Sequence, residues 1–184
     1  QKVGLLAGRI ELIISDRETA YVNTRAQIEG IPIFSFNPKK YLNKEEYELV
    51  IVEILQEMKI DYLILAGYMR LIGPILLNAY TNKIVNLHPS LLPSFQGKNA
   101  VEQAFNYGVK VTGVTVHFVD EGMDTGPIIK QRAVKIEEHD TLKTLTDKIH
   151  QEEHKVLLEA VNLVLSDKVI VDKNRVILKE NNYD

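Results

Sequence analysis

Hydrophobic and polar positions follow two different patterns along this chain, one typical of buried strands and one typical of helices. Compact apolar runs typical of buried strands occupy residues 10–15, 31–36, 62–66 and 84–88. Between these runs, apolar residues recur at the spacing of a helix face, which predicts helices over residues 17–29, 43–58 and 73–80. Strands that alternate with helices are typical of a parallel sheet, so the first half of the chain predicts an α/β fold.

The second half of the chain has a different order of elements. The predicted elements are a helix over 99–107, strands over 112–120 and 128–136, a helix from the Thr141 cap to about Leu165, and a hairpin of residues 169–171 and 176–178. The later strands follow one another too closely for helical crossovers, which favours antiparallel pairing. We therefore expect a mostly parallel central sheet with helices on both faces and antiparallel C-terminal strands.

Composition limits the classes of function that this chain can have. Its 184 residues are enough for one domain, and the net charge of −3 offers no basic surface for nucleic acid. The absence of cysteine excludes disulfides and thiolate metal sites, and no apolar run approaches the roughly 20 residues of a membrane span. We expect a soluble, cytoplasmic protein with small-molecule partners, and neither nucleic acid nor membrane among its partners.

The run at residues 84–88 ends in a group of polar residues that could do chemistry. Asn86 and His88 lie two positions apart, so an extended strand projects both from one face at its carboxyl end. Pro89 keeps His88 extended. Leu92-Pro93 marks a second bend, whose peptide bond could be trans or cis. A satisfied histidine at a strand end and a catalytic amide–imidazole pair both fit this segment.

A second polar group follows the strand predicted at residues 112–120. Thr115 and His117 share one face of that strand, and an acidic loop broken by glycine then carries Asp124. A carboxylate beside His88 would fix one tautomer of the imidazole and favour its protonated form. The two segments together predict an Asn86, His88 and Asp124 constellation.

These segments resemble the folate-dependent formyltransferases, and most closely the branch that formylates glycinamide ribonucleotide. The matching stretches are Asn86–Pro93, Thr115–Val119, Gly122–Pro127 and Ala66–Ile72, within a likeness that runs from about Glu11 to the C-terminal strands. The resemblance implies a Rossmann-like formyltransferase fold, with 10-formyltetrahydrofolate as co-substrate and no metal. It implies glycinamide ribonucleotide and folate as the small-molecule partners and leaves monomer and homodimer open.

The resemblance also bears on the start of the chain. We expect residues 1–184 to be a single formyltransferase catalytic domain that lacks roughly 20 N-terminal residues, which in the family hold a first strand and a phosphate-binding loop. Residues 1–8 read as the last turns of a helix. Gln96 stands where the resembled loop commonly has a proline, so we expect that loop to be more mobile.

The family's roles transfer to residues of this chain that match its motifs. Asn86 is expected to donate to the oxyanion, His88 to act as the acid and Asp124 to tune it, with Thr115 and His117 in support. The residues expected to bind folate are Lys44, Met69, Arg70, Leu71, Ile72, Asn86, Asp120, Glu121, Gly122, Met123 and Asp124. The residues expected to bind the ribonucleotide are His150, Gln151, Glu152 and Glu153.

Other functions compete with this interpretation. His150-Gln151-Glu152-Glu153-His154 has the spacing of an inverted zinc-peptidase motif, and a metal-dependent hydrolase would use His150, Glu153 and His154. Within the resembled fold, formyltetrahydrofolate deformylase and sugar-nucleotide formyltransferases are alternatives, although Pro89 after His88 argues against the deformylase. The lack of a basic stripe argues against methionyl-tRNA formyltransferase. A folate-binding module without turnover also remains open.

Overall fold

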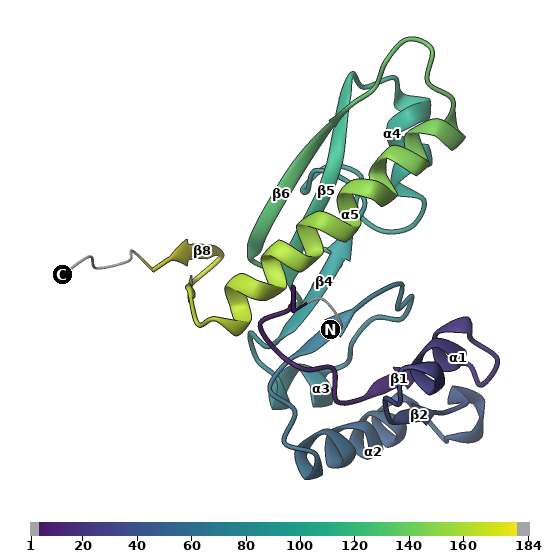
Figure 1. Cartoon of the computed structure of the whole chain (residues 1–184), viewed down its shortest axis with the longest axis vertical. Coiled ribbons are helices and arrows are strands. Elements are labelled where there is room, and N and C mark those ends of the chain that lie inside the picture. The colour runs from purple at the N-terminus through teal and green to yellow at the C-terminus, as the bar shows by residue number, and fades with distance from the viewer. Residues whose placement is uncertain (1–3, 180–184) are drawn as a thin grey trace.

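The computed structural model describes residues 4–179 and confirms the α/β class predicted from the sequence (Figure 1). Its strands are β1 (Ile13–Ser15), β2 (Ile33–Ser35), β3 (Leu63–Leu65), β4 (Ile84–His88), β5 (Val111–Phe118), β6 (Ile128–Lys135), β7 (Val169–Asp172) and β8 (Arg175–Leu178). Its helices are α1 (Tyr21–Ile28), the 3₁₀ turn η1 (Pro38–Lys40), α2 (Lys44–Glu57), α3 (Pro74–Ala79), α4 (Ala100–Tyr107) and α5 (Leu142–Leu165).

The described strands form one small and one large sheet. β1 and β2 pair in parallel by themselves, and the larger sheet has the order β3-β4-β5-β6-β8-β7. In the larger sheet β3–β4 and β6–β8 are parallel, whereas β4–β5, β5–β6 and β7–β8 are antiparallel. The larger sheet is therefore mixed, and its antiparallel part begins at β4, one strand earlier than the spacing of the elements suggested.

Helix α5 covers the larger sheet and supplies half of the buried residues of the core between them (Figure 1). Thr141 caps the helix as the sequence predicted, because its hydroxyl accepts a hydrogen bond from the Thr144 amide while the Thr144 hydroxyl accepts from the Thr141 amide. Residues at helix spacing bury their side chains against the sheet: Leu145, Ile149, Val156, Ala160 and Val164. This packing fixes β4 and β5, the two strands that carry the polar motifs.

A second core lies between α2, α3 and the strands of the first half of the chain. Asn43 caps α2 through a hydrogen bond from the Glu46 amide, and Tyr47, Ile51 and Leu55 form its buried stripe. The core fixes where β3 ends and therefore where the loop of residues 66–73 begins.

Two expectations near the N-terminus are wrong. Residues 4–8 do not end a helix, because their backbone bonds to α5 instead: Asn162 accepts from the Ala7 amide and donates to the Leu5 carbonyl. The first helix begins at Tyr21 rather than Arg17. The carbonyls of Arg17 and Glu18 accept hydrogen bonds from the Asn23 side chain, which turns this stretch before the helix starts. Residues 1–3 lie outside the described part of the chain.

None of the helices between residues 4 and 179 combines the length and the hydrophobicity that a membrane crossing requires.

Candidate active site

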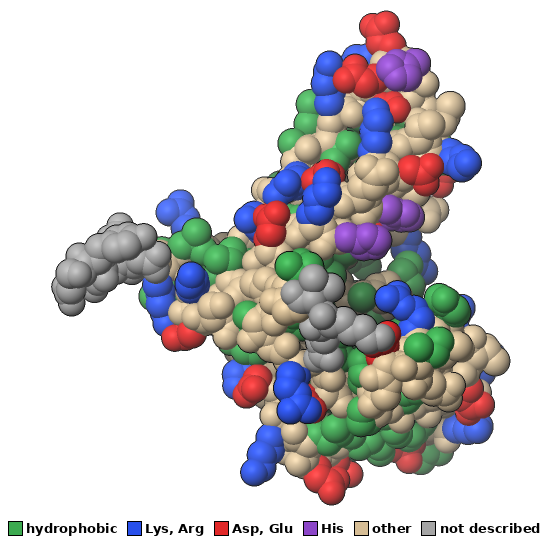
Figure 2. All heavy atoms as spheres, in the orientation of Figure 1, with side chains coloured by type: hydrophobic (Ala, Val, Ile, Leu, Met, Phe, Trp, Pro, Cys, Tyr) green, Lys and Arg blue, Asp and Glu red, His purple; other side chains and the backbone are tan. Residues whose placement is uncertain are grey.

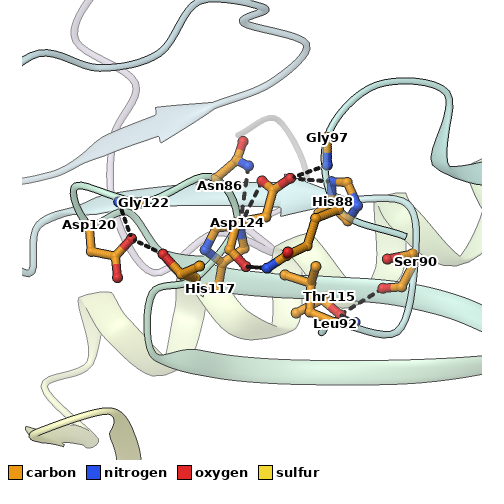
Figure 3. A network of polar contacts seen from close by, with 12 residues as sticks. Asn86, His88, Ser90, Leu92, Gly97, Thr115, His117, Asp120, Gly122 and Asp124 are labelled. Carbon is orange, nitrogen blue, oxygen red and sulfur yellow. Dashed lines mark hydrogen bonds and ion pairs between the residues drawn. The ribbon is translucent and has the colours of Figure 1, made fainter. Parts of the chain in front are cut away.

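The pairing of β4 with β5 brings the two polar motifs of the sequence together. Asn86 lies opposite His117, and His88 lies opposite Thr115, so all four side chains belong to neighbouring positions of one sheet. Asp124 reaches the same place from the loop that follows β5 (Figure 3). The predicted Asn86, His88 and Asp124 constellation is therefore present as a cluster at the carboxyl end of β4.

His88 is buried and both of its ring nitrogens face oxygen atoms. Nε2 lies 2.8 Å from the carbonyl oxygen of Phe95, and Nδ1 lies 3.3 Å from Oδ2 of Asp124. A neutral imidazole has only one N–H and can donate to only one of these acceptors. The imidazolium donates to both, so each ring nitrogen has an acceptor when the ring carries two protons.

Asp124 is held in place by the loop that carries Phe95. Its backbone is in the left-handed region at φ 57°, and its Oδ2 accepts a hydrogen bond of 2.8 Å from the Gly97 amide. Gln96 donates to the Asp124 carbonyl at 3.3 Å, so this side chain ties the two loops together. The loop at Gln96 thus contacts both the backbone and the carboxylate of Asp124, and its greater mobility stays a prediction.

His117 lies on the other side of Asp124 and contacts Asn86. Burial lowers the pKa of His117, and this effect opposes the hydrogen bond to Phe118 and the charge of Asp124, both of which raise it. A neutral ring that donates from Nδ1 to the Phe118 carbonyl at 2.8 Å keeps a lone pair on Nε2. That lone pair accepts from the Asn86 amide at 3.3 Å, which orients the amide (Figure 3).

Thr115 fixes the backbone that follows His88. Its hydroxyl is fully buried, donates to the Ser90 carbonyl at 2.7 Å and accepts from the Leu92 amide at 3.1 Å. Gln131, directly opposite on β6, donates to the same hydroxyl and to the Leu92 carbonyl. Sequence reasoning missed Gln131, although its pairing position opposite Thr115 is the signal that could have found it.

Replacing Thr115 with valine is expected to lower the free energy of unfolding by about 1–3 kcal/mol, because the Leu92 amide loses its partner in a buried place. Urea denaturation of both proteins measures this difference. Thr112→Val is the matched control, since Thr112 lies on the same strand and is equally buried, yet its hydroxyl has no hydrogen-bond partner within residues 4–179. Equal losses in the two variants would show that the Thr115 hydrogen bonds are unimportant.

The apolar residues expected to line the folate site differ in how far their side chains are exposed. Met69, Leu71 and Met123 expose 70%, 60% and 52% of their surface, which leaves their apolar side chains accessible to a ligand. Ile72 instead is partly buried and packs against the core around α2, and its contact with folate stays a prediction.

The acidic loop of residues 120–124 is shaped by its first member. Asp120 accepts hydrogen bonds from the Gly122 amide at 3.1 Å and the Thr125 hydroxyl at 2.7 Å (Figure 3). The Asp120 carboxylate is therefore used to form the turn, and Glu121, Gly122 and Met123 are exposed on it. Backbone groups of such a turn are available to a ligand, as the resemblance implies.

The two basic residues expected at the folate tail both have acidic neighbours. The Nζ atom of Lys44 lies 3.8 Å from Oε1 of Glu48, a carboxylate that is 1% exposed and also accepts from the Gly73 amide. The Nε atom of Arg70 lies 2.7 Å from Oδ2 of Asp16. Both cations remain partly exposed, so neither contact removes them from a ligand.

Helix α5 brings part of the predicted ribonucleotide motif to the site. Burial raises the pKa of Glu153, and the charges of His150, His154 and, least of all, His88 partly oppose this. Histidine side chains gather over α5 beside a hollow in the molecular surface (Figure 2). His150 and Gln151 are exposed on this helix and free to meet a ligand there.

Glu152 is engaged elsewhere. It lies 2.7 Å from the Nζ atom of Lys155 and 3.5 Å from Nη1 of Arg132, whose other terminal nitrogen binds Glu159. One position along a helix turns a side chain by about 100°, so Glu152 belongs to this ion-pair network on β6 while Glu153 approaches His88. Glu152 thus has ion-pair partners within the protein, and its expected contact with the ribonucleotide stays a prediction.

The rival metal site is not formed. Within residues 4–179 no three His, Asp or Glu side chains come together in a way that could hold a metal ion. His150 contacts Glu153 at 3.8 Å, but no further ligand joins this helical pair. The spacing that resembles an inverted zinc-peptidase motif is a feature of one helix face.

The cluster can stabilise a negative charge and move a proton at the same point. Asn86 offers an amide donor, His88 offers an N–H next to a carboxylate, and Glu153 offers a partly buried base. These are the groups that an acyl transfer to an amine requires, because a tetrahedral oxyanion forms and one proton must pass between two nitrogens.

Comparisons with known proteins agree with this chemistry. The sequence profile of the formyl transferase family matches residues 1–161. The phosphoribosylglycinamide formyltransferase of Bacillus subtilis (strain 168) is 56% identical over 144 residues, which are 78% of this chain and 74% of that protein.

Two solved structures extend the likeness to three dimensions. Phosphoribosylglycinamide formyltransferase from Bacillus halodurans is 54% identical with a TM-score of 0.87, over 90% of this chain and 86% of that one. Glycinamide ribonucleotide transformylase 1 from Symbiobacterium toebii is 41% identical with a TM-score of 0.94, over 97% of this chain and 84% of that one.

Proposed function

This chain belongs to the formyl transferase family, and from that premise we propose that it transfers the formyl group of 10-formyltetrahydrofolate to the amine of 5'-phosphoribosylglycinamide. The products are formylglycinamide ribonucleotide and tetrahydrofolate, in purine biosynthesis. We prefer this activity to those of formyltetrahydrofolate deformylase and of sugar-nucleotide formyltransferases, which share the fold. The reason is that the relatives at 54% and 56% identity are phosphoribosylglycinamide formyltransferases by name.

The observation that carries the proposal is the contact of His88 with Asp124 beside Asn86. The substrate amine attacks the formyl carbon and forms a tetrahedral intermediate whose oxygen carries a negative charge. The Asn86 amide, oriented by His117, donates to this oxygen, and the imidazolium of His88 supports it through charge. His88 then gives its proton to N10 of the folate, so that tetrahydrofolate leaves as a neutral amine.

Glu153 completes the proton balance. The attacking amine becomes positively charged when its nitrogen bonds to carbon, and it must lose one proton before the products separate. Burial raises the pKa of Glu153, which makes this carboxylate a better base than an exposed one, and its electrostatic interaction with His88 supports a role beside the imidazole. Glu153 accepts the proton that the amine releases, and the overall reaction then neither gains nor loses protons.

Transfer should survive removal of metal ions, because no described group of residues could hold one. The full-length protein, treated exhaustively with a chelator, is expected to form tetrahydrofolate and formylglycinamide ribonucleotide at its untreated rate. Absorbance of the folate products and mass spectrometry of the ribonucleotide measure both. Activity that is lost with chelator and restored by zinc would contradict the proposal and support a metal-dependent enzyme.

The assay also separates an enzyme from a folate-binding module. A module would bind the folate with no product formed, whereas we expect product only when both substrates are present. The cytoplasmic location and the choice between monomer and homodimer stay predictions.

A further inference from the structure

An ion pair joins the ends of two strands that belong to different sheets. Asp16 directly follows β1, and Arg70 lies in the loop after β3, 54 positions further along the chain. Oδ2 of Asp16 accepts a hydrogen bond of 2.7 Å from Nε of Arg70, and the two side chains are 23% and 45% exposed. The contact is short and joins the charged nitrogen Nε directly to a carboxylate oxygen, although the arginine side chain itself is exposed.

The contact with Asp16 leaves the terminal N–H groups of the Arg70 guanidinium without a hydrogen-bond acceptor among residues 4–179. Within residues 4–179, Asp16 engages Nε, and the terminal nitrogens Nη1 and Nη2 make no hydrogen bond. A guanidinium bound at Nε still offers the pair of terminal N–H groups that matches the two oxygens of a carboxylate. Asp16 therefore fixes the plane of the guanidinium without occupying the edge that binds ligands best.

The surroundings keep this arginine charged and in place. The hydrogen bond to Asp16 raises the pKa of Arg70, and the nearby hydroxyls of Tyr47 and Tyr68 act in the same direction. Burial raises the pKa of Tyr68 well above its ordinary value, so the ring stays neutral next to the cation. The second nearby carboxylate, Glu48, is directed at the Gly73 amide.

We propose that Asp16 is a positioning residue, which holds Arg70 by Nε so that Nη1 and Nη2 meet the glutamate carboxylate of the formyl donor. This inference rests on the proposed function, because it concerns the tail of the folate. Arg70 touches the donor, and Asp16 acts through Arg70. The exposed side chains of Met69 and Leu71 on the same loop supply the apolar surface beside this carboxylate site.

A merely structural ion pair would give a different result from a positioning contact. If Asp16 only joins two loops, its removal lowers stability and affects every donor alike. If Asp16 aims Arg70, its removal weakens donors that carry a glutamate carboxylate and leaves donors without one unchanged. The comparison of two donors therefore isolates the proposed role.

The experiment measures kcat and KM of the full-length protein and of Asp16→Ala with two donors. These are 10-formyltetrahydrofolate and the primary amide of 10-formyltetrahydropteroate, which lacks the glutamate and carries no carboxylate. Asp16→Ala is expected to raise KM for the first donor about five- to tenfold, with kcat unchanged. KM for the second donor should equal that of the unaltered protein. An equal rise for both donors, or no rise for either, would overturn the inference.

Three further variants make the test specific. Asp16→Glu keeps a carboxylate and is expected to restore part of the lost affinity. Asp16→Ala added to Arg70→Ala should have no further effect on KM, because the effect passes through Arg70. Glu11→Ala is the matched control, since it removes another carboxylate that pairs with an arginine in the same half of the chain, 3.1 Å from Arg9. Its KM should stay unchanged.

The outcomes separate this inference from the proposed function. If the unaltered protein forms formylglycinamide ribonucleotide and Asp16→Ala behaves like it with both donors, the inference fails and the function stands. If the unaltered protein forms no product, the function fails and the inference fails with it.

Discussion

Replacing Asp124 with asparagine is expected to lower kcat by about 10²–10⁴ while the affinity for folate changes only a few-fold. The amide keeps the shape of the side chain and can still accept from the Gly97 amide. It removes the negative charge that lies 3.3 Å from Nδ1 of His88 and that pairs with this ring while it acts as the acid. Binding is preserved because the loop keeps its geometry, and the loss falls on the step in which a proton moves.

Steady-state kinetics with both substrates, together with the dissociation constant of the folate measured by calorimetry, checks this expectation. Asp147→Asn is the matched control, because Asp147 is an exposed aspartate on α5, and it should leave both quantities unchanged. Turnover close to that of the unaltered protein in Asp124→Asn would mean that another carboxylate tunes His88. Loss of folate binding in step with kcat would mean that Asp124 mainly shapes the loop.

Much of this site could be predicted because its chemistry lies in short segments with local rules. Period-two alternation put Asn86 and His88 on one face of β4, and the position of Thr115 and His117 on β5 followed in the same way. The capping boundaries of α2 and α5 were also correct, since the residues that satisfy a helix end are close in sequence. That Asp124 meets His88 was expected from the resemblance and from the chemistry that the motif requires.

The partners of these residues could not be predicted, because they depend on how distant segments pack. Nothing local to Phe95 indicates that its carbonyl accepts from His88, and nothing local to Gln96 indicates that it binds the Asp124 carbonyl. The engagement of Glu152 by Arg132 depends on how α5 packs on β6. The contact between Asp16 and Arg70 likewise required the relative placement of two sheets.

The mixed order of the larger sheet was harder to predict for a similar reason. The helix-containing connection between β4 and β5 looks like a parallel crossover in the sequence, yet the two strands run antiparallel. Direction is set by where the connection packs and not by its length alone. The antiparallel pairing is important for the site, since it places His117 opposite Asn86.

Replacing His88 with alanine is expected to slow formyl transfer by about 10²–10⁴, because the variant has no acid next to the leaving nitrogen. His88→Ala combined with Asp124→Asn should be little slower than His88→Ala alone, since Asp124 acts through the imidazole and residues that work as a unit are not additive. Added imidazole should restore part of the rate, because the ring is 5% exposed and its removal leaves a space that fits it. If the two losses in rate were fully additive, Asp124 would act independently of His88.

The most direct test of the account is the single-turnover rate of formyl transfer in the full-length protein and in His88→Ala, with both substrates saturating. This rate reports the chemical step and is insensitive to product release. The account predicts formylglycinamide ribonucleotide and tetrahydrofolate in equal amounts from the unaltered protein, and a rate at least about 100-fold lower in His88→Ala. Equal rates in the two proteins would contradict it.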